Sequence, residues 1–112
     1  MAFSEETTDG VLVLGVTGNI QTETSDELLA KLNGLTDQGV RHFLLDFSGV
    51  EYINSSGLRV LLIIAKKLNR LAGKIVIANA TEWIQEVLRA SGCAAVIGFY
   101  PFQEEALKAI KA

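Results

Sequence analysis

Residues 42–47, His-Phe-Leu-Leu-Asp-Phe, form a short and nearly continuous apolar run. A strand with one face in water alternates apolar and polar residues, whereas a strand buried on both faces reads as a continuous apolar run. Two-sided burial is typical of parallel strands whose crossover helices cover the sheet. The run therefore predicts a central strand in an α/β fold.

The residues before this run predict a hairpin and a helix. The dipeptide Asp9-Gly10 separates two strand-like segments, residues 3–8 and 11–16, and is a strong short-range signal for a hairpin. Ser25 precedes two acidic residues and a set of leucines at helical spacing, so we expect it to cap a helix that ends near Gly39. Two antiparallel strands and a first helix thus open the fold.

The residues after the run continue the alternation. A long amphipathic helix is expected to begin near Asn54, and two further strands are expected at residues 74–78 and 95–100. Thr81 and Gly92 should bound the helix between those strands, and residues 102–110 should form a last helix. The order β-β-α-β-α-β-α-β-α predicts a single α/β domain over residues 1–112, with a mixed sheet of about five strands and about four helices.

Charge and composition argue against several classes of function. The net charge is −3, with eight acids and two bases in residues 1–46 but five acids and eight bases in residues 47–112. A duplex-binding domain usually presents a concentrated basic face on a basic protein, so nucleic acid is not an expected ligand. The apolar runs are far shorter than the roughly 20 residues of a membrane span. With neither a basic leader nor an apolar N-terminus, the chain is expected to be cytoplasmic.

The sequence offers no motif for metal, cofactor or catalysis. Cys93 is the only cysteine and His42 the only histidine, which excludes an internal disulfide and leaves too few ligands for a zinc site. We expect Cys93 to be a small buried residue beside the Gly92 turn. No Gly-x-Ser-x-Gly elbow, phosphate-binding loop or His-Glu-x-x-His motif occurs. The expectation is therefore no metal, no cofactor and no enzymatic activity.

The turn between the central strand and the long helix, residues 46–58, is where function is expected. Ligand and partner sites in open α/β sheets gather beyond the carboxyl ends of the strands. Asn54 and Ser55 are both good N-cap residues. The simplest interpretation is therefore that Asn-Ser-Ser only satisfies the free amides of the helix.

Read as a whole, the turn resembles the signature of STAS domains, and in particular that of the anti-sigma factor antagonists. The resemblance rests on Asp-Phe-Ser-Gly-Val, a tyrosine-containing link, and Asn-Ser-Ser-Gly-Leu-Arg-Val-Leu-Leu. It extends to the opening hairpin, to residues 18–20 and to the later β-α-β segment. The first serine of the family's Asp-Ser-Ser/Thr-Gly-Leu motif accepts phosphate, and that serine corresponds to Ser55. The sequence departs at Asn54, where many members have Asp, and at Arg59, where some have Gly.

The resemblance implies a regulator switched by phosphorylation. Unphosphorylated, it would sequester an anti-sigma factor that is also a serine kinase of histidine-kinase-like fold, and so free a sigma factor. A serine phosphatase would reverse the modification. Arg59, four residues after Ser55, is placed to hold the phosphate. The expected docking face comprises Asn19, Ile20, Gln21, Thr22, Asn54, Ser55, Ser56, Gly57, Arg59, Ile63 and Lys66.

Two alternatives stay open at this point. Ile63 falls among the bases of the long helix, away from an apolar side predicted to hold Leu58, Leu61, Ala65, Leu68 and Ala72. It is either an ordinary exposed isoleucine or an apolar anchor for an acidic groove of the partner. The domain as a whole is either the switch described above or a constitutive STAS subunit of a lipid or anion transporter or of another signalling complex.

Overall fold

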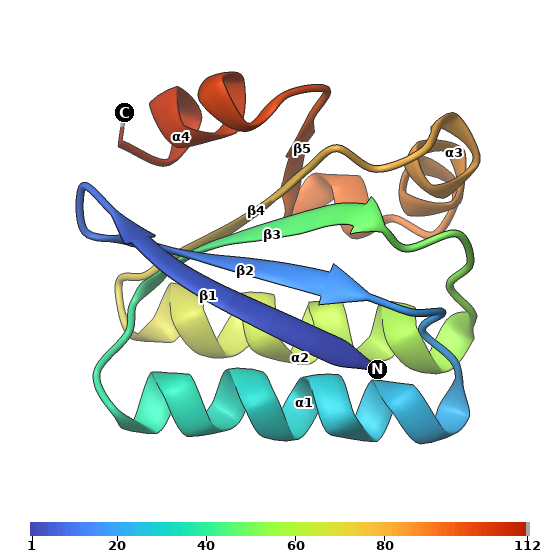
Figure 1. Cartoon of the computed structure of the whole chain (residues 1–112), viewed down its shortest axis with the longest axis horizontal. Helices are drawn as coiled ribbons and strands as arrows, with labels where there is room; N and C mark the ends of the chain where they lie inside the picture. The colour runs from blue at the N-terminus through green and yellow to red at the C-terminus, as the bar shows by residue number, and fades with distance from the viewer. Residues whose placement is uncertain (112) are drawn as a thin grey trace.

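The chain forms a five-stranded mixed sheet with helices on both faces (Figure 1). The computed structural model describes residues 1–111. In chain order the elements are β1 (Ala2–Thr8), β2 (Val11–Thr17), α1 (Thr22–Asp37), β3 (His42–Gly49), α2 (Ser55–Arg70), β4 (Lys74–Ala78), α3 (Glu82–Ala90), the short 3₁₀ helix η1 (Cys93–Ala95), β5 (Gly98–Tyr100) and α4 (Gln103–Lys111).

The strands lie side by side in the order in which they occur in the chain, so β3 is the central strand. β1 pairs antiparallel with β2 across the Asp9-Gly10 turn, where both residues have positive φ. All the other neighbours are parallel, and a helix connects each parallel pair. The predicted hairpin, central strand and element order are confirmed.

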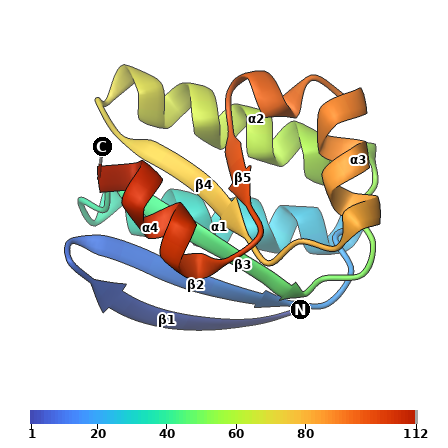
Figure 2. The ribbon, with the colours of Figure 1, turned by 90° about the horizontal axis from the view of Figure 1, so that it is seen from above.

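Two apolar layers explain the composition of β3. Phe43, Leu45 and Phe47 belong to the core between the sheet and α1, α2 and α3. Leu44 belongs to a second core beneath α4, which Figure 2 shows lying across the opposite face of the sheet. All four side chains are fully buried. Because both faces are covered, the residues between His42 and Asp46 are all apolar, and Asp46 lies near the carboxyl end of the strand.

The first helix begins earlier than the sequence predicts. α1 starts at Thr22 with Gln21 as the N-cap. The backbone amide of Gln21 donates to Thr24 Oγ1 at 2.8 Å, and the Thr24 hydroxyl donates to the Asn19 carbonyl at 2.6 Å. Ser25, the predicted cap, is buried within the first turn and donates to the Thr22 carbonyl at 2.9 Å. The Ser25 prediction is wrong because the side chain of Thr24 already supplies the capping oxygen.

The last strand is shorter than predicted. β5 covers only Gly98–Tyr100, because Gly92, at φ 84°, turns the chain into η1 before the strand begins. The Ile97 amide donates to the Cys93 carbonyl at 2.9 Å, and both side chains are buried. The buried position predicted for Cys93 is confirmed. The prediction of a strand over residues 95–100 is therefore right for residues 98–100 and wrong for residues 95–97.

Helix α3 matches its predicted cap. The Thr81 hydroxyl accepts a hydrogen bond from the Ile84 amide at 3.2 Å. Ile84 and Leu88 are buried on its inner face. Ser91 is exposed, because the helix ends at Ala90.

Candidate functional site

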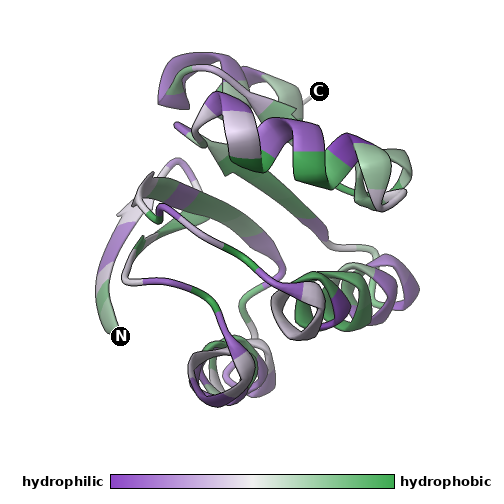
Figure 3. Ribbon diagram, turned by 90° about the vertical axis from the view of Figure 1, so that its right-hand side faces the viewer, coloured by the Kyte–Doolittle hydropathy of each residue, from purple (hydrophilic) through white to green (hydrophobic). Residues whose placement is uncertain are grey.

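The site is built from two loops that meet at the carboxyl edge of the sheet, the edge that Figure 3 faces. Residues 18–21 follow β2, and residues 50–54 follow β3. The backbone amide of Ile20 donates to the Tyr52 carbonyl at 2.9 Å, and the backbone amide of Asn54 donates to the Ile20 carbonyl at 3.0 Å. These bonds accompany an isolated parallel bridge between Ile20 and Ile53. The two loops are therefore held together as one rigid platform in front of α2.

Asn54 alone caps helix α2. Its Oδ1 accepts hydrogen bonds from the amides of Ser56 at 3.0 Å and Gly57 at 3.3 Å. Ser55 is the exposed first residue of the helix, and its hydroxyl has no hydrogen-bond partner within residues 1–111. The interpretation that the whole Asn-Ser-Ser cluster serves as a cap is thus too broad. The Ser55 hydroxyl is left available for chemistry.

Gly57 allows α2 to approach the platform closely. A Cβ atom at this position would lie 2.6 Å from Ile20 Cγ2 and 2.7 Å from Ile53 Cγ1. Gly57, Ile20 and Ile53 are all buried. Two members of the predicted docking face, Ile20 and Gly57, therefore lie beneath that surface and support it. The docking role of the exposed members stays a prediction.

An exposed stripe runs along α2 from Ser55. At about 100° per residue, Ser55, Arg59, Ile63 and Lys66 fall on one side of the helix. All four residues are exposed, and the last three have long side chains. Ile63 is 43% exposed to solvent. The stripe is therefore basic, with one apolar side chain at its centre.

The buried face of α2 differs from the predicted one. Val60 and Ile64 are buried, although the prediction left them out. Ala72 is exposed at φ 60°, beyond the helix end at Arg70. Lys67 is half-buried and ties α2 to α1, because its Nζ donates to Asn33 Oδ1 at 3.0 Å and lies 3.8 Å from Asp37 Oδ1.

A groove of about 310 Å³ separates the stripe from α1. Leu29 and Val60 contribute apolar surface to it, and Asp26 and Arg59 contribute opposite charges. Its lining residues are Thr22, Ser25, Asp26, Leu29, Ser56, Arg59, Val60 and Ile63. The groove gives the predicted docking face a recess that a partner side chain can enter.

Asp46 joins the ends of β3 and β4 beside this platform. Its Oδ1 accepts hydrogen bonds from the Ser48 amide at 3.0 Å and from Asn79 Nδ2 at 3.1 Å. Burial raises the pKa of Asp46, but the hydrogen bonds from Ser48 and Asn79 outweigh this effect and hold the pKa below its ordinary value. The ionised carboxylate therefore stabilises this edge of the sheet.

We expect Asp46→Asn to lower the free energy of unfolding by about 0.5–1 kcal/mol at pH 7, since a partly exposed charged acceptor is lost. A lowered folded-state pKa gives stability that is present above the unfolded pKa and is lost as the pH falls through the folded value. The deficit of the variant should therefore be smaller below about pH 4 than at pH 7. Urea unfolding of the wild type and the variant at pH 3 and pH 7 measures the loss of stability at each pH. A loss that is larger at pH 3 than at pH 7 would contradict a stabilising role for the ionised carboxylate.

An aromatic pair at the same edge was missed from the sequence. Tyr52, in the loop before α2, stacks on Trp83, in the first turn of α3, with ring centroids 5.6 Å apart and planes 17° apart. Both rings are exposed, at 42% and 49%. The one signal in the sequence was the single tryptophan placed in a polar helix start.

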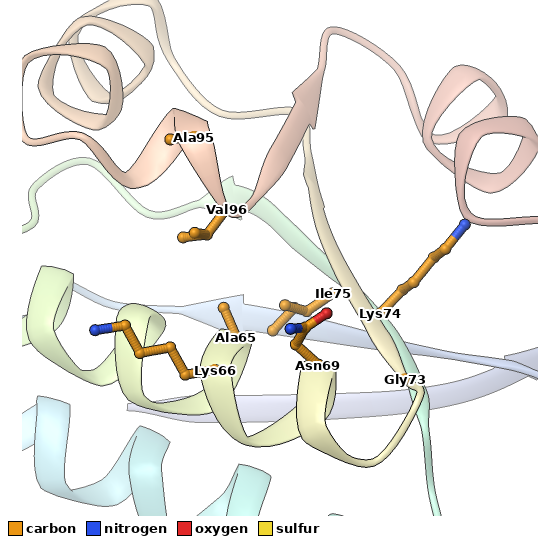
Figure 4. Close-up of a pocket in the computed structure, with 8 residues that line it drawn as sticks. All are labelled: Ala65, Lys66, Asn69, Gly73, Lys74, Ile75, Ala95 and Val96. Carbon is orange, nitrogen blue, oxygen red and sulfur yellow. The ribbon is translucent and has the colours of Figure 1, made fainter.

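A second groove, of about 320 Å³, lies between the C-terminal half of α2 and η1 (Figure 4). The ammonium groups of Lys66 and Lys74 point away from each other there, so its charged groups do not converge on a ligand. Residues 1–111 also bring no three His, Cys, Asp or Glu side chains together where they could hold a metal ion. The helices within that range are all too short or too polar to span a bilayer.

Comparison with known sequences identifies relatives along the whole chain. Residues 2–106 match the family model of the STAS domain. BtrV of Bordetella bronchiseptica, a protein named for the role of anti-sigma factor antagonist, is 31% identical over 111 residues, which cover 99% of this chain and 96% of BtrV.

Solved structures share the fold. The protein tm1081 of Thermotoga maritima, of the same designation, superposes with a TM-score of 0.92 at 21% identity, covering 98% of this chain and 95% of the other. SpoIIAA of Bacillus in its phosphorylated form superposes with a TM-score of 0.72 at 22% identity, covering 97% of this chain and 99% of SpoIIAA. The fold also forms part of the murine anion transporter Slc26a9, with a TM-score of 0.80 at 18% identity, covering 95% of this chain but 18% of the transporter.

Proposed function

The chain belongs to the STAS domain family, and from that membership we propose that it is an anti-sigma factor antagonist switched by phosphorylation of Ser55. The observation that carries the proposal is the availability of Ser55. This serine is exposed at the first position of α2, and its hydroxyl is unused within residues 1–111 because Asn54 caps the helix. The designation of BtrV supports the role.

The partner is an anti-sigma factor that is also a serine kinase of histidine-kinase-like fold. Unphosphorylated chain sequesters it and frees a sigma factor, and a serine phosphatase restores this state. The basic stripe of Arg59 and Lys66, with Ile63 between them, suits an acidic partner groove that accepts one apolar side chain. The interaction takes place in the cytoplasm and involves neither nucleic acid nor catalysis by this chain.

The start of α2 suits phosphate chemically. The amide dipoles of a helix N-terminus favour an anion, and the phosphate adds about 1.5–2 negative charges there. Arg59, one turn along, is exposed and makes no ion pair within residues 1–111, so its guanidinium is placed to hold the phosphate. The existence of a phosphorylated form of SpoIIAA, which has the same fold, is consistent with such tolerance.

The proposal is tested by phosphate transfer. The anti-sigma factor encoded beside this protein, or captured by it, is incubated with the chain and ATP. The γ-phosphoryl group should pass from ATP to Ser55 Oγ with release of ADP, and mass spectrometry should find one phosphate, on residue 55. Ser55→Ala should lose the label completely.

Ser56→Ala is the matched control, because Ser56 is the adjacent serine and its contribution to the cap comes from its backbone amide. It should retain the label. Phosphate on Ser56, or an anti-sigma partner that binds but never transfers phosphate, would refute the switch.

A constitutive transporter subunit is the second candidate, favoured by the occurrence of the fold in Slc26a9. That function needs no modification of Ser55. Transporter genes beside this one, together with a Ser55 that stays unphosphorylated in cells under every growth condition, would replace the switch by the subunit.

A further inference from the structure

The stacked pair Tyr52 and Trp83 keeps two large rings half in water. Their mutual contact accounts for the orientation of the rings but leaves much of their surface uncovered. Aromatic side chains of this kind are enriched at protein interfaces, where a few of them carry much of the affinity. Their exposure points to a partner.

Hydrogen bonds hold the backbone segments that carry the pair, and one of these segments leads to Ser55. The Tyr52 carbonyl accepts a hydrogen bond from the Ile20 amide within the two-loop platform, and Tyr52 is three residues before Ser55. Trp83 lies in the first turn of α3, whose cap is the hydroxyl of Thr81. Tyr52 and Ser55 therefore belong to one short segment, so a partner that docks over Ser55 comes close to the rings.

The charge around the rings selects the chemistry of the contact. Glu51 and Glu82, each directly before one of the rings, are both exposed. The faces of aromatic rings attract cations, and carboxylates pair with guanidinium groups. We use the term aromatic patch for Glu51, Tyr52, Glu82 and Trp83. The aromatic patch is thus opposite in charge to the stripe on α2.

We infer that the aromatic patch binds an arginine side chain of the same anti-sigma partner, as a second contact beside Ser55. Arginine fits better than lysine because its planar guanidinium stacks on rings while pairing with carboxylates. The chain itself contains such a contact, since the Arg89 guanidinium lies 5.0 Å from the ring centroid of Phe99. Acidic and basic contacts together would fix the orientation of the partner. This inference rests on the proposed function for the identity of the partner.

The first test needs only a small probe. The probe is the capped tripeptide N-acetyl-Gly-Arg-Gly-amide, and its neutral match carries citrulline in place of arginine. Trp83 is the single tryptophan, so its fluorescence reports the aromatic patch directly. The arginine peptide should change the emission in a saturable way with a weak affinity, about 10 mM, and the citrulline peptide should not. Equal responses to both peptides, or none to either, would overturn the inference.

The second test uses the anti-sigma factor from the phosphate-transfer assay. Trp83→Ala should weaken its binding about 10-fold or more, and the double variant Glu51→Gln/Glu82→Gln about 5-fold, with a weaker salt dependence. The matched control is Glu104→Gln/Glu105→Gln, which removes the same charge from exposed positions of α4 and should stay within about 2-fold.

The outcomes separate the two proposals. Binding that responds to phosphate on Ser55 but is unchanged by the aromatic-patch variants overturns this inference and leaves the proposed function standing. Binding that responds to neither removes both. If sedimentation finds a dimer of the chain that Trp83→Ala abolishes, the occupant is a second copy, and the inference of an arginine contact is wrong.

Discussion

Alanine in place of Gly57 should lower the free energy of unfolding by about 1–3 kcal/mol. The new Cβ would lie 2.6 Å from Ile20 Cγ2 and 2.7 Å from Ile53 Cγ1, far inside the roughly 3.5 Å of normal contact. Both isoleucines are buried and β-branched, so neither can rotate away, and overpacking of this kind outweighs the gain of about 1 kcal/mol in helix propensity. Urea unfolding measures the change. Because Ile20 belongs to the platform, partner affinity should fall too.

Gly34 provides the matched control for that substitution. It lies inside α1, it is exposed, and a Cβ atom there meets nothing within 4 Å. Gly34→Ala should therefore raise the free energy of unfolding by about 0.5–1 kcal/mol, through helix propensity alone. The two substitutions are the same chemically and should have opposite signs. If both stabilise the protein, α2 does not pack against the platform as closely as described.

The parts of the fold that sequence predicts well have local signals. Asp9-Gly10 selects a hairpin turn, the run at residues 42–47 reports burial on two faces, and Thr81 caps its own helix. The failures have causes that lie elsewhere in the chain or compete locally. Ser25 was a good cap by type, but a bond between the Gln21 amide and the Thr24 hydroxyl starts the helix earlier.

Local signals likewise predict only part of the candidate functional site. Its position and its serine follow from the turn after β3, yet the split of roles between Asn54 and Ser55 does not, because both residue types cap helices well. Ile20 is a member of the predicted docking face, yet it is buried and forms a bridge to Ile53, 33 positions along the chain. The contact between Tyr52 and Trp83 is likewise long-range. Residue type and spacing do not encode such pairings.

Phosphate on Ser55 should weaken binding of the anti-sigma factor at least about 100-fold while changing the stability of the chain by less than about 1 kcal/mol. The helix N-terminus of α2 stabilises the added charge in the free protein by about 0.3–1 kcal/mol. In the complex the same charge is desolvated and faces the acidic groove proposed for the partner, where like charges cost several kcal/mol. A cost of about 2.7 kcal/mol gives the 100-fold loss. Calorimetric titration and urea unfolding of the phosphorylated chain measure the two quantities separately.

Gln103→Asp is the control that separates a local effect from a general one. It also adds a negative charge to the first residue of a helix, but that helix, α4, covers the opposite face of the sheet. Its effect on stability should resemble that of phosphate in sign, because the helix dipole acts in the same way at both places. Its effect on partner affinity should stay within about 2-fold. If both modifications weaken binding equally, the loss comes from net charge, and the hydroxyl at the start of α2 has no special place in the interface.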